Sequence, residues 1–192
     1  MANPYKLYIQ QIEFDGSTYT KGKPIDTLEK FNVVCEECPF VLFPERKDLP
    51  TRDWADQHGL DAYIPSVLPI KEYDLDVKFL YKRTRNGSSV TDDTVRTEIK
   101  NFIKFLYGRV GSGVTGDTVM NPRLAIYSED TGIGRKDVVI SKVGNKIFFH
   151  TDYDDDVVAD FEVKFTVMDP VTDVTPSYVT VGGVDVLNYL TW

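Results

Sequence analysis

The chain is short of the residues that most catalytic and metal sites use. Its 192 residues include only two cysteines and two histidines. No segment approaches the roughly 20 consecutive apolar residues of a membrane-spanning helix, and the first residues lack the charged-then-apolar order of a signal peptide. Basic residues are also in deficit, since 22 Lys and Arg face 30 Asp and Glu, which gives a net charge of −8. These absences predict synthesis in the cytoplasm and no membrane partner. They also predict no specific nucleic-acid binding, which needs a basic face.

The residues that are abundant are typical of a β-rich globular protein. Hydrophobic residues make up 42% and charged residues 27% of the chain, which is ordinary for a globular domain. A chain of this length can bury a real hydrophobic core. Aromatic residues account for 12% and are mostly Tyr and Phe, a composition that favours strands.

The clearest strand pattern runs from Val157 to Pro170. Apolar and polar side chains alternate along it, and period-two alternation of this length is a strong strand signal. Pro170 cannot donate a ladder hydrogen bond, so we expect the strand to end there. Six apolar residues share the face expected to be buried: Val157, Ala159, Phe161, Val163, Phe165 and Val167.

Further strands follow from the same alternation. The segment 73–81 alternates cleanly. A hairpin is predicted for 137–142 and 146–150, with Gly144 and Asn145 at its turn. The other predicted strands are 5–14, followed by a turn at 15–17, then 124–127, and a strand-like tail over 178–192 interrupted by Gly182 and Gly183.

One segment, Asp92 to Tyr107, has the spacing of an amphipathic helix. Thr91 suits the N-cap, Asp92 suits the positive helix N-terminus, and Gly108 suits the left-handed position after the C-terminus. The apolar face consists of Val95, Ile99, Phe102, Ile103, Leu106 and Tyr107.

These elements predict a mainly β (α+β) fold, an antiparallel β-sandwich or open barrel with one packed α-helix at about residues 92–107. The predicted organisation is a core over residues 1–171 and a strand-like tail over 172–192. Within the core, prolines punctuate a polar segment at about 44–69. Because a loop this long is uncommon in a compact domain, we expect an extended Pro-rich arm or a functional loop there.

Three short motifs suggest ligand binding and fail on context. Gly111–Gly116 reads G-x-G-x-x-G, but it follows a helix C-terminus, whereas the dinucleotide motif leads into a helix N-terminus. Cys35 and Cys38 form a C-x-x-C pair without the further ligands of a zinc site. Structural thiols are favoured, and a site shared between subunits stays open. The aspartates of 152–156 lack the later Gly and Glu of an EF-hand, which favours a solvated turn over a weaker cation site.

Motifs of nucleophilic catalysis are missing as well, because there is no G-x-S-x-G elbow and no catalytic-cysteine signature. The sequence therefore predicts a protein that is not an enzyme and has no cofactor or metal. Large aromatic residues outside the predicted core are candidates for self-assembly or docking, because such residues often mark contact surfaces, with ordinary edge packing as the alternative. These residues are Trp54, Tyr63, Tyr189 and Trp192.

The order of elements from Tyr73 to Val171 resembles that of a known family. The pattern is a strand YDLDVKFLYK, a helix TVRTEIKNFIKFLYG, a short strand RLAIYSED, a hairpin DVVISKVGNKIFF and a long strand DFEVKFTVMDPV. It resembles the distal tail protein (Dit) family of long-tailed phages and prophages, which belongs to a superfamily of tail-tube-like proteins. The resemblance covers about half of the chain.

The resemblance implies a structural role. Distal tail proteins form a hexameric ring between the tail tube and the baseplate hub, and DNA passes through the ring. We therefore expect homo-oligomerisation, contacts with other tail and baseplate proteins, and a location in the virion tail after synthesis in the bacterial cytoplasm. The segment 44–69 is expected to reach a neighbouring subunit. The alternative hypothesis is a monomeric β-sandwich binding module, for example for carbohydrate, using Trp54, Tyr63 and the 152–156 loop.

Overall fold

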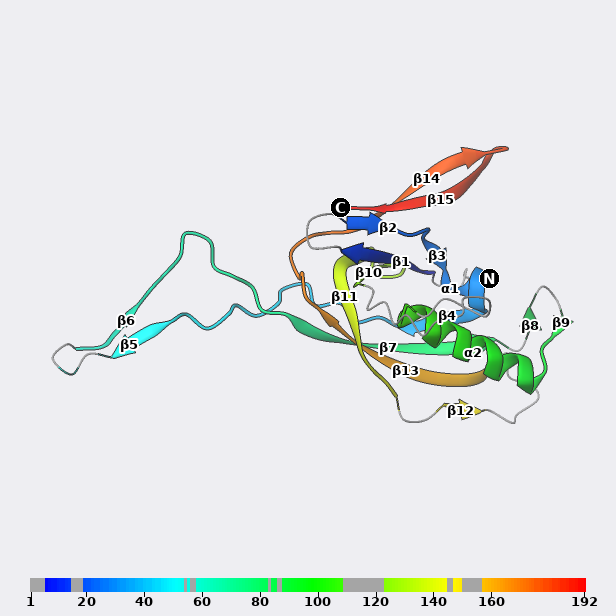
Figure 1. Ribbon diagram of the computed structural model, residues 1–192, viewed down its shortest axis with the longest axis horizontal. Coiled ribbons are helices and arrows are strands. Elements are labelled where there is room, and N and C mark those ends of the chain that lie inside the picture. The colour runs from blue at the N-terminus through cyan, green and yellow to red at the C-terminus, as the bar shows by residue number, and fades with distance from the viewer. Residues whose placement is uncertain are drawn as a thin grey trace.

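The computed structural model is mainly β, with a curled antiparallel half-barrel sheet and two helices, one of which packs on the sheet (Figure 1). It describes residues 6–14, 19–53, 55, 58–82, 84–85, 88–108, 123–144, 147–149 and 157–192. The main sheet has the strand order β2-β1-β10-β11-β13-β7-β4, with β3 also paired to β1 and β12 to β13. The predicted fold class, an open β structure with a packed helix, is confirmed.

The described elements have the following bounds: β1 Leu7–Phe14, β2 Tyr19–Lys21, β3 Ile25–Asp26, α1 Thr27–Phe31, β4 Val33–Glu37, β5 Thr51–Asp53, β6 Leu60–Ala62, β7 Tyr73–Lys82, β8 Thr84–Arg85, β9 Ser88–Ser89, α2 Asp92–Leu106, β10 Arg123–Ser128, β11 Ile133–Val143, β12 Phe148–Phe149, β13 Val157–Val167, β14 Thr175–Val181 and β15 Val184–Thr191.

Strand β13 lies inside the main sheet, between β11 and β7. It pairs with β7 along nearly its whole length, from Val157 opposite Lys82 to Val167 opposite Tyr73. The side chains at 159, 161, 163, 165 and 167 are buried. The predicted strand and its buried face are therefore confirmed for these positions, while the Val157 side chain lies outside the described set.

Helix α2 covers the buried face of β7 and β13. Its Phe102 ring packs against Phe79 on β7 and Phe161 on β13, at centroid distances of 5.1 and 6.1 Å. Thr91 caps the N-terminus by accepting a hydrogen bond from the backbone N–H of Thr94, and Gly108 adopts a positive φ of 71°. The predicted helix and its caps are confirmed, with the end one residue earlier, at Leu106.

A second, five-residue helix was not expected. Asp26 caps α1 by accepting hydrogen bonds from the backbone N–H groups of Leu28 and Glu29, and Asn32 ends the helix in the left-handed region with a φ of 58°. Such a short helix shows no amphipathic period in the sequence, because it spans little more than one turn. It packs through Phe31 against the Phe102 ring of α2.

The predicted hairpin over 137–142 and 146–150 is wrong. In the described part of this segment, β11 starts at Ile133 and β12 covers only Phe148–Phe149, and both pair with β13 rather than with each other. The N–H of Gly144 donates to the carbonyl of Glu162 on β13, at 2.7 Å. β11 and β12 thus pair with the same strand, although the turn signal between them predicted that they would pair with each other. Pairing with the long strand β13 decides the register of both.

The tail forms a hairpin, β14–β15, whose turn residues Gly182 and Gly183 both have positive φ. Turns of this kind match the twist of paired strands, so the predicted interruption at the two glycines is confirmed. The base of the hairpin packs on the face of β1 and β10 that points away from α2. A second hydrophobic cluster forms there from Tyr8, Ile12, Ala125, Val174 and Leu190.

Several predictions concern residues outside the described set. These are the turn at 15–17, the glycine motif at 111–116, the aspartates at 152–156, Asn145 with Lys146, and Trp54. The segment between β4 and β7 is described for most of its length. It extends away from the body as an arm whose far part holds β5 and β6 (Figure 1).

Candidate functional site

Two β-ribbons project from the packed body and form the candidate site: the arm over residues 41–72 and the hairpin β14–β15. Figure 1 shows them leaving the body in different directions. At the root of the arm the two lengths of chain pair in antiparallel fashion, through a bridge between Arg46 and Ile70 and a 2.7 Å hydrogen bond from the N–H of Lys71 to the carbonyl of Glu45. Both ribbons therefore have ordered backbone pairing without a sheet around it.

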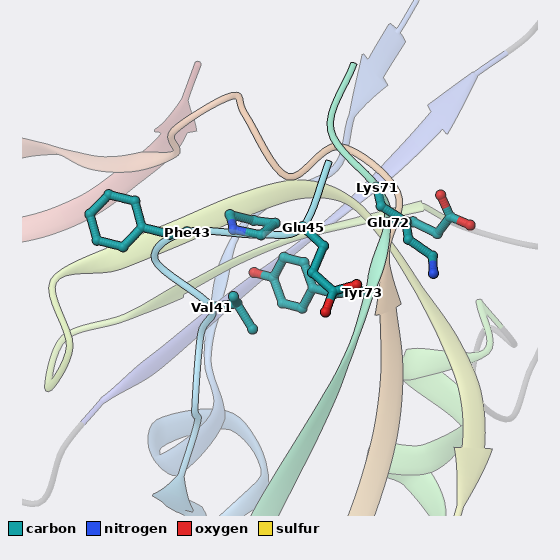
Figure 2. Close-up of a pocket in the computed structure, with 7 residues that line it drawn as sticks. Val41, Phe43, Glu45, Lys71, Glu72 and Tyr73 are labelled. Atoms are coloured by element: carbon teal, nitrogen blue, oxygen red, sulfur yellow. The ribbon is translucent and has the colours of Figure 1, made fainter. Parts of the chain in front are cut away.

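A cavity of about 370 Å³ lies at the root of the arm. Figure 2 shows Tyr73 at its centre, with Val41 and Phe43 on one side and Lys71 and Glu72 on the other. Burial raises the pKa of Tyr73, against the opposing influence of the Arg135 guanidinium. The phenol is therefore neutral at ordinary pH and does not act as a base. The cavity is lined by both apolar and charged side chains.

Large apolar side chains of the arm are held in solvent. Phe43 is 92% exposed and Tyr63 is 71% exposed. Scattered exposed apolar residues are normal on a monomer, but here they gather on one thin extension that has no core of its own. The exposed set on the arm is Leu42, Phe43, Tyr63, Ile64 and Val67.

The hairpin β14–β15 has one face made of exposed valines. Val179 pairs with Val186 and Val181 with Val184, and residues directly opposite on paired strands share a face. The other face holds the Thr180–Asp185 pair, joined by a 2.7 Å hydrogen bond from the threonine hydroxyl to the carboxylate. The exposed side chains on the first face, named here the valine face, are Val179, Val181, Val184 and Val186.

The four aromatic residues singled out from the sequence lie in different places. Tyr63 is on the arm, and Tyr189 is on β15 and about half exposed. Trp192 is partly buried against the second cluster, with the Lys21 ammonium 3.3 Å from its ring centroid, so its ring contacts this chain itself. Trp54 lies outside the described residues. Of the described residues, Tyr189 lies on β15, Trp192 directly follows that strand, and Tyr63 lies on a separate ribbon.

The end of the terminal strand is fastened to the body by a buried glutamine. The Gln10 side chain accepts a hydrogen bond from the N–H of Leu190, at 3.0 Å, and donates one to the carbonyl of Gly22, at 2.6 Å. Nearby, burial and a hydrogen bond with Tyr178 raise the pKa of Tyr8, so its hydroxyl stays neutral. These contacts fix the base of the hairpin on the body, and the valine face extends from that fixed base.

The cysteine pair has no features of a reactive site. Both thiols are buried and reduced, and a hydrogen bond with Cys35, together with burial, raises the pKa of Cys38. Because the thiolate is the nucleophile and the metal ligand, a raised pKa makes the thiol inert. The described residues also contain no cluster of three or more His, Cys, Asp or Glu arranged to hold a metal ion. None of the described helices has the length and apolar character needed to cross a membrane.

Sequence reasoning missed the most exposed apolar residues. Phe43 lies in the run FVLF between Pro39 and Pro44, where hydrophobic composition suggests burial. The two prolines were the available signal, because proline cannot join a sheet interior. On the hairpin, the segment TVGGVDV shows the turn, but its alternation does not tell whether the valine face is covered.

Comparison with known proteins adds no assignment: no protein-family model matches the chain, and no curated protein sequence matches it.

Proposed function

We propose that this chain is a non-enzymatic structural protein of a phage or prophage tail that self-assembles into a ring. The observation that carries the proposal is the pair of projecting ribbons with their exposed apolar side chains. The resemblance of the segment 73–171 to the distal tail protein family supplies the kind of assembly, a hexameric ring between the tail tube and the baseplate hub.

Both ribbons are small and expose apolar side chains to water. A two-stranded ribbon is marginally stable at best in water on its own. Here the arm carries five exposed large apolar side chains and the hairpin carries six. Burying one such side chain contributes about 1.5–3 kcal/mol. Packing against other subunits would stabilise both ribbons, whereas a monomer leaves their apolar surface in water.

The acidic character of the chain is compatible with this role. The net charge of −8 keeps phosphate contacts unfavourable, since nucleic-acid binding depends on releasing counterions through basic contacts. A ring through which DNA passes needs a surface to which DNA does not adhere. We expect other tail and baseplate proteins to be partners, and no cofactor to take part.

The alternative, a monomeric carbohydrate-binding module, relies on Trp54 and the 152–156 loop, which lie outside the described residues. Tyr63 is exposed, as a sugar-stacking residue must be, but it stands on the arm without a second described aromatic ring beside it. No described contact favours this alternative.

Sedimentation velocity over a wide concentration range, with negative-stain imaging of the concentrated sample, tests the proposal. We expect a concentration-dependent oligomer and ring-shaped particles. Changing Val181 and Val184 together to Ser should weaken association at least tenfold while leaving monomer stability nearly unchanged. The control, Thr175→Ser, alters the same hairpin at an exposed polar position. A chain that stays monomeric at every concentration, alone and with tail proteins, would refute the proposal, and glycan-array binding by such a monomer would favour the alternative.

A further inference from the structure

Two surfaces on opposite sides of the sheet carry charges of opposite sign. Helix α2 packs through Phe102 against Phe79 of β7 and Phe161 of β13. Because successive side chains of a strand point to opposite faces, Asp76 and Glu162 point away from α2. Both are exposed. The helix therefore covers one face of the sheet, and a charged face is left on the other side.

Two carboxylates of the charged sheet face, those of Asp76 and Glu162, form no ion pair with a described residue. Lys164 pairs with Asp74 at 2.8 Å, and Lys78 pairs with Glu37 at 3.0 Å. The pKa of Lys164 is raised mainly by its hydrogen bond with Asp74 and only secondarily by Asp76. Lys78 and Lys164, which lie directly opposite Glu162 and Asp76, are thus already engaged with other carboxylates. A third lysine of this face, the exposed Lys142, lies opposite Lys164 on β11.

The outer side of α2 carries the complementary charge. Its buried residues, Val95, Ile99, Phe102 and Leu106, define the inner side. Lys100 and Lys104 lie on the opposite side of the helix, are exposed, and make no ion pair within the described part of the chain. Arg96 is exposed too, but it is paired with Asp93 at 3.5 Å. The helix thus presents two available ammonium groups.

The spacing of the two pairs matches. Lys100 and Lys104 are one turn apart, a rise of about 6 Å along the helix. Asp76 lies opposite Lys164 and Glu162 lies opposite Lys78, so the two carboxylates are diagonal neighbours on adjacent strands, about 7–8 Å apart. An α-helix laid across this face can bring one lysine to each carboxylate.

We propose that the outer side of α2 in one copy of this chain docks on the charged sheet face of a second copy, with Lys100 and Lys104 opposite Asp76 and Glu162. The inference rests on the proposed self-assembly and names one of its interfaces. Since the two surfaces belong to the same chain and point in opposite directions, the contact is heterologous, and such contacts build closed rings or open filaments.

A second copy fits α2 better than a nucleic acid does. Only two cations of the helix are available, whereas stable nucleic-acid binding neutralises many phosphates. The rest of the chain is acidic, with a net charge of −8. Charge complementarity of this kind contributes more to orientation and to the choice of partner than to affinity. It therefore suits an interface that sets the orientation of subunits, while the apolar ribbons supply most of the buried contact area.

Reciprocal charge reversal tests the pairing. The helix variant carries Lys100→Glu and Lys104→Glu, and the sheet variant carries Asp76→Lys and Glu162→Lys. Each variant alone should associate at least tenfold more weakly than the unaltered chain in sedimentation velocity, because each presents like charges at the contact. Mixing the two in equal amounts should restore association, since each then meets its complement in alternation. Association of the unaltered chain should also weaken as salt is raised from about 50 to 500 mM, because salt screens exposed charges.

Controls separate a lost contact from a lost fold. Circular dichroism melting should show the helix variant folded like the unaltered chain, because both changes are on an exposed helix side. If the sheet variant melts early, the neutral pair Asp76→Asn and Glu162→Gln replaces it, and weaker association is still expected. Lys104→Glu should weaken association more than Lys23→Glu, an exposed change that alters the net charge equally.

Three results would overturn the inference. In the first, both reversed variants assemble as well as the unaltered chain, which leaves self-assembly intact and assigns it to other surfaces. In the second, association is lost in each variant but not restored by mixing. In the third, the helix variant loses binding of a duplex DNA fragment at physiological salt while its self-association is unchanged. An unaltered chain that never associates would instead remove the proposed function itself.

Discussion

The packed body and the two projecting ribbons use the same kinds of residues in opposite ways. In the body, apolar residues of β7, β13 and α2 alternate or recur on one side and are buried in a single core. In the arm and the β14–β15 hairpin, many large apolar residues lie in solvent. Hydrophobic composition alone therefore does not show whether a surface is buried. Some apolar surfaces of this protein are buried within the chain, and others are exposed.

The two regions also differ in what holds them. The body is stabilised by a cluster of aromatic rings, in which Phe102 contacts Phe31, Phe79 and Phe161. At the root of the arm its two lengths of chain pair with each other, and the base of the hairpin packs on the body through a small second cluster. We therefore expect mutations in the body to lower stability, and mutations in the ribbons to weaken assembly with little effect on stability.

The largest expected effect comes from Phe102→Ala, which removes the ring at the centre of the body. Because Phe102 is fully buried, the cavity should lower the free energy of unfolding by about 3–5 kcal/mol. Urea denaturation monitored by circular dichroism measures it. The matched change on the arm, Phe43→Ala, should alter the same quantity by less than about 0.5 kcal/mol. Equal losses from the two changes would contradict the distinction between body and arm.

A smaller loss should follow from Gly134→Ala, at the place where the hairpin base joins the sheet. A Cβ atom at Gly134 would lie 2.5 Å from the carbonyl oxygen of Val174 and 3.0 Å from that of Ile126. Backbone atoms cannot rotate away as a side chain can, so overpacking should cost about 1–3 kcal/mol of stability. An unchanged melting temperature would show that the hairpin base is not held against β10 and β11.

The buried Gln10 side chain tests whether the terminal strand unfolds separately from the body. Replacing it with Ala leaves the N–H of Leu190 and the carbonyl of Gly22 without the partners they have now, and an unsatisfied buried group costs about 1–3 kcal/mol. Amide hydrogen exchange should accelerate at Leu190 and its neighbours on β15 while amides of β13 keep their protection. Faster exchange spread evenly over both strands would mean that the terminal strand belongs to the cooperative body.

The smallest effect concerns pH at the turn that links β13 to the hairpin. Burial raises the pKa of Asp169, but hydrogen bonds from Thr172 and Val171 and the nearby Lys136 outweigh it, so the pKa lies below its usual value. A depressed pKa in the folded state stabilises the protein above the unfolded value of about 3.9. That contribution is lost as pH falls through the folded value.

Asp169→Asn tests this, because the amide keeps the shape but loses the charge. The free energy of unfolding from urea denaturation should be larger for the unaltered protein than for the variant, by an amount on the order of 1 kcal/mol at pH 6. The difference should shrink below pH 4. A difference that persists unchanged down to pH 2 would show that the carboxylate charge has no part in it.

How far the sequence predicts the structure depends on the length of each pattern. Strand β13 and helix α2 repeat their periods over 11 and 15 residues, so their type and buried face follow from the sequence. Helix α1 has five residues, too few for a period to show. The prediction of a hairpin over 137–150 was wrong because it relied on Gly144-Asn145, a local turn signal. The observed register is set instead by pairing with β13, which follows later in the sequence.

The candidate site was less predictable than the fold. Tyr63 and Tyr189 were recognisable as large aromatic residues near turn signals, and both are exposed. Phe43 and the valine face were not recognisable, because an apolar side chain has the same sequence signature whether a neighbouring strand covers it or not. For Trp192 the sequence left docking and ordinary edge packing open, and the ring lies beneath Lys21, 171 positions earlier in the chain.

By itself, the sequence determined the mainly β fold class, the buried faces of β7 and β13, helix α2 with its caps, and the glycine turn of the last hairpin. These features depend on local conformational preference and on hydrophobic period, which neighbouring residues settle. The tertiary structure alone decided that β11 and β12 share the edge of β13, that the arm stands apart from the body, and which apolar and charged faces remain uncovered. Those outcomes depend on pairing between distant segments, which no local pattern encodes.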